Sequence, residues 1–122
     1  MEKVLGIGGL FFRARDPKAL AAWYEKYLGI TPVPTDYDQP VWKQEAGSTV
    51  FSAFEEGTEY FGDKSLQWMV NFRVRNLDAM VAQLKAAGSK VVVDEHDYPN
   101  GRFARAHDPE GHPIELWEPK EP

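Results

Sequence analysis

Three side chains with useful chemistry lie around one tight turn near the end of the chain. Arg105 and His107 precede Asp108-Pro109-Glu110-Gly111, and Glu115 follows it. Proline second and glycine fourth favour a three-residue hairpin with a bulge, in which Arg105 faces Glu115 across two strands. A two-residue loop would place Ala104 there instead. In the first register a permanent cation offsets the carboxylate, and Glu115 and His107 are the candidate acid–base groups.

Alternation along the strands separates an apolar face from a mixed one, because side chains point in turn to the two faces of a sheet. In the stretches 4–14 and 66–74, one parity is apolar and is expected to pack under helices. The other parity suits a small-molecule cleft, although the same face could form a subunit interface or be solvated. The candidate ligand-binding residues on this face are Phe11, Arg13, Ser52, Phe54, Met69, Asn71, Arg73, Phe103, Arg105 and Trp117.

The chain repeats itself in two halves. Phe12-Arg13-Ala14-Arg15-Asp16 corresponds to Phe72-Arg73-Val74-Arg75-Asn76, and a second match relates 51–55 to 114–118. Each half is expected to form a strand, a helix and three strands. Asp16 and Asn76 are the predicted helix N-caps, and Gly29 and Gly88 the predicted stops. The strands are expected at 4–14, 42–45 and 49–55, with a short one among the preceding prolines, and then at 66–74, 90–94, 102–107 and 113–118.

This scheme divides a single domain, residues 1–122, into a first module at about 1–56, a linker at 57–65 and a second module at about 66–119. The linker could cover the cleft or form an interface. The hydroxyls of Tyr60 in the linker and of Tyr98 could also act, although tyrosine more often packs with its hydroxyl bonded.

Composition excludes several classes of function. The chain has 122 residues, 14 Lys and Arg against 19 Asp and Glu, and a formal net charge of −5. It therefore lacks the basic footprint that nucleic acids require. No apolar run reaches the roughly 18 residues of a membrane span. The absence of cysteine excludes disulfides and thiolate chemistry, and makes a cytoplasmic location the expectation.

Two βαβββ modules in a chain of this length resemble the vicinal oxygen chelate superfamily, which holds glyoxalases, bleomycin-resistance proteins and extradiol dioxygenases. The resemblance covers essentially the whole chain, and its most specific text is the opening 8–17 and the ending 108–119, which reads DPEGHPIELWEP. It implies an α+β fold with a cupped mixed sheet and helices on the outer face. It further implies a small-molecule site inside the cup, and a homodimer.

Metal-using members of that superfamily place four ligands, usually His and Glu, on four strands. The matching positions here hold Gly9, Ser52, Met69 and Glu115. Only Glu115 suits a divalent first-row ion, which needs about three protein ligands in a catalytic site. No cofactor is therefore expected: a divalent metal ion is possible but disfavoured.

Two functions follow as expectations. The first is a protein that binds or sequesters a small aromatic or acidic ligand in a metal-free cleft. The alternative is a glyoxalase-like, metal-dependent lyase or isomerase that uses Glu115 as base or ligand. Gly9 and Met69 argue against a third function, that of an extradiol dioxygenase, because the iron site of those enzymes needs two histidines and a carboxylate. Whether the chain is an enzyme stays open at this point.

Overall fold

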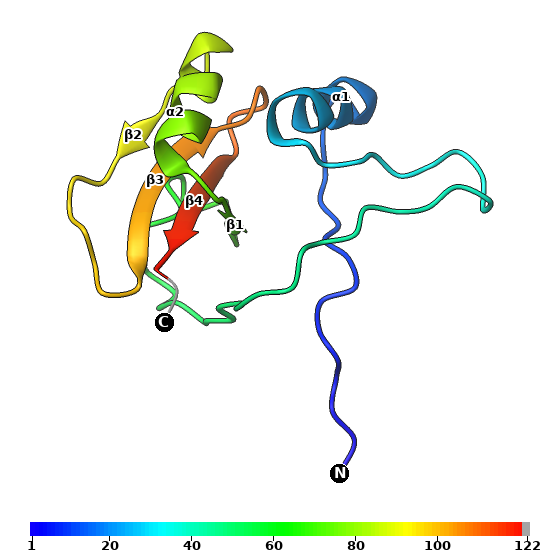
Figure 1. Cartoon of the computed structure of the whole chain (residues 1–122), viewed down its shortest axis with the longest axis horizontal. Coiled ribbons are helices and arrows are strands. Elements are labelled where there is room, and N and C mark those ends of the chain that lie inside the picture. The colour runs from blue at the N-terminus through cyan, green and yellow to red at the C-terminus, as the bar shows by residue number, and fades with distance from the viewer. Residues whose placement is uncertain (121–122) are drawn as a thin grey trace.

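Residues 1–120 are described by a computed structural model, in which two helices pack on a four-stranded mixed sheet (Figure 1). The helices are α1 (Pro17–Leu28) and α2 (Leu77–Ala86), and the strands are β1 (Val70–Arg73), β2 (Val92–Val93), β3 (Gly101–His107) and β4 (Pro113–Pro119). The strand order is β1-β4-β3-β2. β1 runs parallel to β4, and the other two pairs are antiparallel. The expected α+β class with an open mixed sheet is confirmed.

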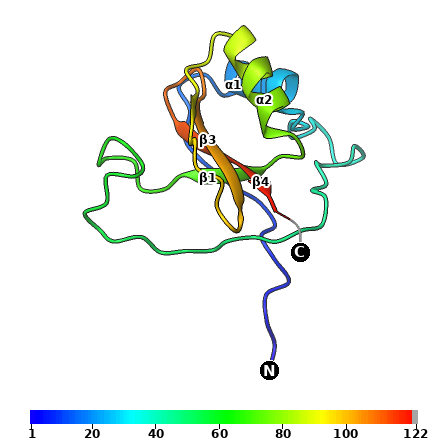
Figure 2. The same ribbon diagram turned by 60° about the vertical axis from the view of Figure 1, so that its left-hand side comes forward.

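One face of the sheet carries the core, as the alternation predicts. Ile114 and Leu116 of β4 are buried against Leu77 and Leu84 of α2. On β1 the same parity places Phe72 in this layer, where it meets Tyr24 of α1 edge to face. Both helices therefore cover the same side of the strands, which Figure 2 shows from a second direction. The opposite face of the sheet is left for the candidate site.

Both helices begin where the capping residues predict. The Asp16 side chain accepts a hydrogen bond from the backbone N–H of Ala19 at 3.1 Å, and Asn76 does the same for Ala79 at 3.0 Å. α1 ends at Gly29, whose φ of 72° is the left-handed conformation that glycine adopts most easily. These N-caps satisfy backbone donors that would otherwise be unpaired.

The strands expected in the first half do not form between residues 1 and 69. The segments 4–14, 42–45 and 49–55 run without strand pairing, and their apolar side chains face outward. Phe11 is 88% exposed and Phe51 is 93% exposed. The N-terminal segment extends away from the sheet in both views (Figures 1 and 2). The prediction is wrong here for a physical reason: a strand needs a partner for its backbone, and alternating side chains do not supply one.

The strands of the second half form where expected, although two are shorter. The predicted 102–107 and 113–118 become β3 and β4. The predicted 66–74 contracts to β1, and 90–94 contracts to β2. The two strands that are shorter than predicted, β1 and β2, lie at the edges of the sheet, where only one neighbouring strand can pair with the backbone.

Candidate functional site

The face of the sheet opposite the helices, which we call the open face, brings together most of the predicted site residues of the second half. The β3–β4 register sets Arg105 opposite Glu115, confirming the hairpin predicted from the Asp108–Gly111 turn. On the other side of β4, Asn71 of β1 is the register partner of Glu115. The full set on this face is Asn71, Arg73, Phe103, Arg105, His107, Glu115 and Trp117.

Glu115 is held by hydrogen bonds rather than by an ion pair. Its carboxylate accepts one from the Tyr60 hydroxyl and one from the Asn71 side-chain amide, the latter at 2.7 Å. The expected Arg105–Glu115 ion pair is wrong: within residues 1–120, no nitrogen–oxygen contact of 4.0 Å or less joins these two side chains. Register partners in a β-ladder have adjacent backbones, but long side chains such as that of Arg105 can still contact other residues.

Arg105 instead lies over an aromatic ring. Its guanidinium carbon is 4.8 Å from the centre of the Tyr60 ring, a cation–π distance. One terminal nitrogen also approaches the Met69 sulfur at 3.4 Å. The arginine therefore contacts the phenol that is bonded to Glu115, and not Glu115 itself.

Tyr60 comes from the segment that precedes the sheet, and it joins the two halves of the chain. Its ring stacks on Phe54 with 5.8 Å between centres and 23° between planes. Partial burial, and after it the hydrogen bond to Glu115 and the charge of that residue, raise the pKa of Tyr60 to about 12 against the opposing effect of Arg105. The sequence marked the Tyr60 hydroxyl as able to act but gave no signal of its partner, because the contact spans a long irregular segment.

Two aromatic rings lie beside this cluster on the open face. Phe103 and Trp117 stack with 6.2 Å between centres and 3° between planes. The Trp117 indole nitrogen donates to the Asn100 carbonyl oxygen at 2.8 Å, which fixes its ring. Tyr98 meets the edge of Phe103 at 5.8 Å. The site thus combines a flat apolar surface with charged and hydrogen-bonding groups.

Two nitrogen atoms on β3 have unused hydrogen-bonding capacity. The Nε of Arg105 and the Nδ1 of His107 are buried, and neither has a partner among the described residues. A buried polar atom without a partner costs about 1–3 kcal/mol. Both atoms belong to side chains whose register places them on the open face, and protein atoms cover both of them.

The remaining predicted ligand-binding residues divide between this cluster and other places. Phe54 and Met69 join it through Tyr60 and Arg105. Arg73 turns to the first half, donating to the carbonyl oxygens of Glu45 at 2.7 Å and of Ala46 at 3.4 Å. The other three lie in the first half of the chain, where all of them are exposed: Phe11, Arg13 and Ser52.

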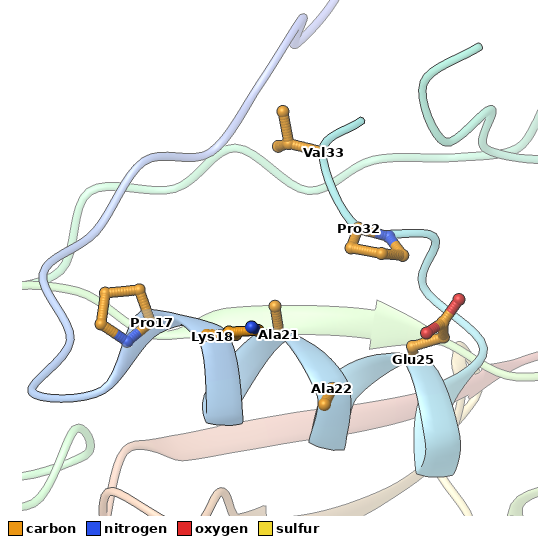
Figure 3. Close-up of a pocket in the computed structure, with 7 residues that line it drawn as sticks. All are labelled: Pro17, Lys18, Ala21, Ala22, Glu25, Pro32 and Val33. Atoms are coloured by element: carbon orange, nitrogen blue, oxygen red, sulfur yellow. The ribbon is translucent and has the colours of Figure 1, made fainter. Parts of the chain in front are cut away.

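Two surface hollows lie outside the open face. The larger, about 510 Å³, runs along the outer side of α1 against Pro32 and Val33 (Figure 3). Its helical lining consists of Pro17, Lys18, Ala21, Ala22 and Glu25. A smaller hollow of about 350 Å³ is lined by Arg13, Ala14, Arg15, Glu110 and His112. Neither hollow includes Glu115, Arg105 or Tyr60.

The residues at the superfamily's metal positions do not fit a divalent ion. Glycine offers no ligand atom at position 9, and the Met69 sulfur suits soft ions. Glu115 is hydrogen-bonded to Tyr60 and Asn71. Within residues 1–120, no group of three or more His, Asp and Glu side chains is placed to hold a metal ion. No chemical step is therefore assigned to a metal.

Comparison with known families identifies the fold. The glyoxalase-like domain family matches residues 9–117, and the chain belongs to that family. A comparison with functionally curated proteins gives no match. Within residues 1–120, no helix has the length and apolar character needed to cross a bilayer.

Solved structures of about the same length share the fold of the chain. A glyoxylase/bleomycin resistance protein/dioxygenase domain from Frankia sp. EAN1pec is 18% identical over 97% of this chain and 100% of its own, with a TM-score of 0.61. Lactoylglutathione lyase from Agrobacterium tumefaciens is 17% identical over 96% of both chains, with a TM-score of 0.58. At these identities the likeness establishes the fold alone.

A shorter match links the chain to TnmS3, an antibiotic-binding protein from Streptomyces sp. CB03234. The identity is 33% over 42% of this chain and 41% of that protein, with a TM-score of 0.38. The chain also matches only 42% and 40% of the next two solved relatives. It thus spans about two-fifths of the length of these three relatives.

Proposed function

We propose that the chain binds a small aromatic or acidic molecule on its open face without a metal ion. One observation carries the proposal: Glu115 is bonded to Tyr60 and Asn71 while Arg105 lies over the Tyr60 ring. A carboxylate, a cation and aromatic surface converge there, which is how small-molecule sites obtain both orientation and apolar contact. The half-buried Phe103, which stacks on the buried Trp117, extends the aromatic surface.

A thermal-shift screen of small molecules with the purified protein tests this proposal, because a ligand of the native state raises the melting temperature by mass action. Compounds that stabilise the wild type should stabilise Glu115→Gln less. Glu95→Gln, which changes an exposed carboxylate, should leave the response unchanged. Metal analysis of the same protein adds a second readout. A stoichiometric divalent ion that disappears with Glu115→Gln would contradict the metal-free assignment.

A proton-transfer enzyme, such as a glyoxalase-like lyase or isomerase, is the second candidate. The hydrogen bond from the Tyr60 hydroxyl to the Glu115 carboxylate favours it. A general base must lie within hydrogen-bonding distance of the proton that it removes, and Glu115 already binds a hydroxyl proton in this way. If Glu115→Gln kept ligand affinity but abolished turnover of that ligand, the enzyme would replace the binding protein as the conclusion.

We also propose that two copies associate through the first half of the chain. This proposal depends on the two-module organisation with its linker at 57–65, which stays a prediction. In the second half β1 pairs in parallel with β4, whereas the equivalent first-half segments are unpaired and expose Leu5, Phe11 and Phe51. Large apolar side chains that are exposed along one part of a chain are typical of a surface that binds a partner.

Sedimentation velocity tests the association directly. A dimer should form in the wild type and weaken in Phe51→Ser, while Val92→Ser, at an exposed position of β2, should have no effect. A wild-type monomer at high protein concentration would overturn the proposal. A cytoplasmic location stays a prediction of the cysteine-free composition, and fractionation of cells expressing the protein would test it.

A further inference from the structure

Tyr60 is held by the rest of the chain in the way a protein holds a bound phenol. Its ring has an aromatic neighbour, Phe54, at 5.8 Å, and a guanidinium, that of Arg105, at 4.8 Å. Its hydroxyl donates to Glu115. These partners come from three separate places, namely the first half of the chain, β3 and β4. Together they recognise a flat ring and a hydroxyl donor.

Apart from Tyr60, the segment that carries it is held by Phe61, whose half-buried ring packs on Phe54 with 5.1 Å between centres. The backbone hydrogen bonds of the segment are those of local turns, from Thr58 N–H to Glu55 at 3.0 Å and from Gly62 N–H to Glu59 at 3.0 Å. Tyr60 itself remains 43% exposed. A segment with few buried contacts and no strand pairing opens at a low free-energy cost.

Tyr24 provides the contrast within the same chain. It also donates to a carboxylate, that of Asp108 at 2.7 Å, but it lies on a helix and packs between Trp23 and Phe72. Displacing Tyr24 would break the packing of α1 on the sheet, whereas displacing Tyr60 would open only a loop.

We propose that Tyr60 is an internal occupant of the ligand site, and that the open face takes a phenol or another hydroxyl-bearing aromatic ring in its place. The inference rests on the proposed small-molecule function and names its ligand class. The incoming ring contacts Phe54 and Arg105, and its hydroxyl donates to Glu115. Asn71 stays bonded to Glu115 throughout, so the carboxylate keeps its orientation when Tyr60 leaves.

The unpaired atoms of β3 extend the ligand class by one feature. The Nε of Arg105 is buried without a protein partner, although the rest of the guanidinium already lies over the ring. When Tyr60 leaves the guanidinium that it covers, a hydroxylated aromatic that also carries a carbonyl or carboxylate oxygen accepts from this Nε. The preferred ligand therefore has a donor for Glu115 and an acceptor for Arg105.

The test uses p-cresol, which is the tyrosine side chain as a free molecule. Tyr60→Ala should bind p-cresol at least about tenfold more tightly than the wild type. A wild-type site that Tyr60 occupies for about nine-tenths of the time has an apparent affinity about tenfold below that of the empty site. Toluene, with the same ring and no hydroxyl, should bind Tyr60→Ala more weakly than p-cresol. Adding Glu115→Gln should weaken this preference, because an uncharged amide oxygen is a poorer acceptor than a carboxylate. Ligand-observed NMR titration gives each dissociation constant.

Tyr37→Ala is the control. Tyr37 is fully exposed and lies outside the open face, whereas the guanidinium of Arg105 lies over Tyr60. Tyr37→Ala should therefore gain no p-cresol affinity. Equal affinities in Tyr60→Ala, Tyr37→Ala and the wild type would overturn the inference.

A second variant covers the case in which Tyr60→Ala fails to fold. Tyr60→Phe keeps the ring and loses the bond to Glu115, so it should bind p-cresol more tightly than the wild type; unchanged affinity would count against the inference. The two proposals also fail separately. If screened compounds bind the wild type through Glu115 while the p-cresol affinity of Tyr60→Ala is no higher than that of the wild type, only the inference fails. If p-cresol binds Tyr60→Ala and nothing binds the wild type, the proposed function fails.

Discussion

At the scale of single residues, Asp108 connects the two halves of the chain. It is 4% exposed, and its carboxylate accepts from the Tyr24 hydroxyl at 2.7 Å and from the backbone N–H groups of Glu110 and His112 at 2.9 and 3.1 Å. One side chain thus fixes the β3–β4 turn and anchors α1 to it. Burial and the neighbouring Asp108 carboxylate raise the pKa of Tyr24, which keeps its hydroxyl protonated as a donor.

Replacing Asp108 by alanine should destabilise the protein by about 1–3 kcal/mol or more, because buried donors lose their acceptor. Tyr24→Phe removes one of the three bonds and should cost about 1 kcal/mol. Urea unfolding of the three proteins gives these differences. Equal stability of Asp108→Ala and Tyr24→Phe would show that the turn does not depend on the carboxylate.

Glu110, two residues further on, makes the stability of this junction depend on pH. The backbone N–H groups of Asp16 and Arg15 donate to its carboxylate at 2.9 and 2.7 Å and hold the pKa of Glu110 below its usual value. A carboxyl group whose pKa is lower in the folded state stabilises the fold at neutral pH. That stabilisation is lost as the pH falls from the unfolded value, near 4.3, through the folded one.

The measurement is the free energy of unfolding of the wild type and of Glu110→Gln as a function of pH. The wild type should be the more stable protein at pH 7, and the difference should shrink as the medium is acidified. A difference that persists unchanged in acid would mean that the charge of Glu110 contributes nothing.

At the scale of elements, the turn between 98 and 101 aligns the aromatic rings of the open face. Gly101 begins β3 with a φ of 131°, and a Cβ there would meet the Glu118 carbonyl oxygen and come within 2.8 Å of the Trp117 indole nitrogen. Glycine is required on both counts, since other residues rarely adopt this φ and would also push β4 away.

Gly101→Ala should therefore destabilise the protein more than Gly111→Ala does. Gly111 also has a positive φ, 87°, but nothing lies within 4 Å of a Cβ added there. Its alanine variant should cost about 1–2 kcal/mol for the conformation alone. Unfolding experiments compare the two, and a smaller loss for Gly101→Ala would contradict the close contact. Trp117 fluorescence should change in the Gly101 variant, although the chain's other tryptophans add to the signal.

At the scale of the whole molecule, local signals in the sequence predicted well and long-range ones did not. The Asp108–Gly111 turn fixed the register of β3 and β4, because a hairpin is closed by its own loop. Asp16 and Asn76 fixed the helix starts through contacts within three residues. The first-half strands failed, because each depends on a partner far along the chain. The contact between Tyr60 and Glu115 could not be predicted, because the residues around each of them in the sequence give no signal of the other.

The two halves also meet at Arg73, which is held against the first half of the chain. It donates to two carbonyl oxygens of the segment 45–46, and Arg75 forms an ion pair with Glu45 at 3.2 Å. The approach is close at Gly47, because a Cβ at that position would displace the Arg73 guanidinium, the flexible end of its side chain. An exposed ion pair adds little by itself, so the carbonyl contacts and this close approach hold the segment to β1.

Gly47→Ala should release the segment 42–47 while leaving the sheet intact. The expected result is faster backbone hydrogen exchange in this segment, with exchange in β3 and β4 unchanged, because local opening is independent of global unfolding. Gly57→Ala is the matched control, since a Cβ there meets nothing within 4 Å. Hydrogen exchange with mass spectrometry resolves the two segments. Equal exchange of the segment 42–47 in the two variants would mean that Arg73 does not hold the two halves of the chain together. The open face would then be bordered only by residues of the second half.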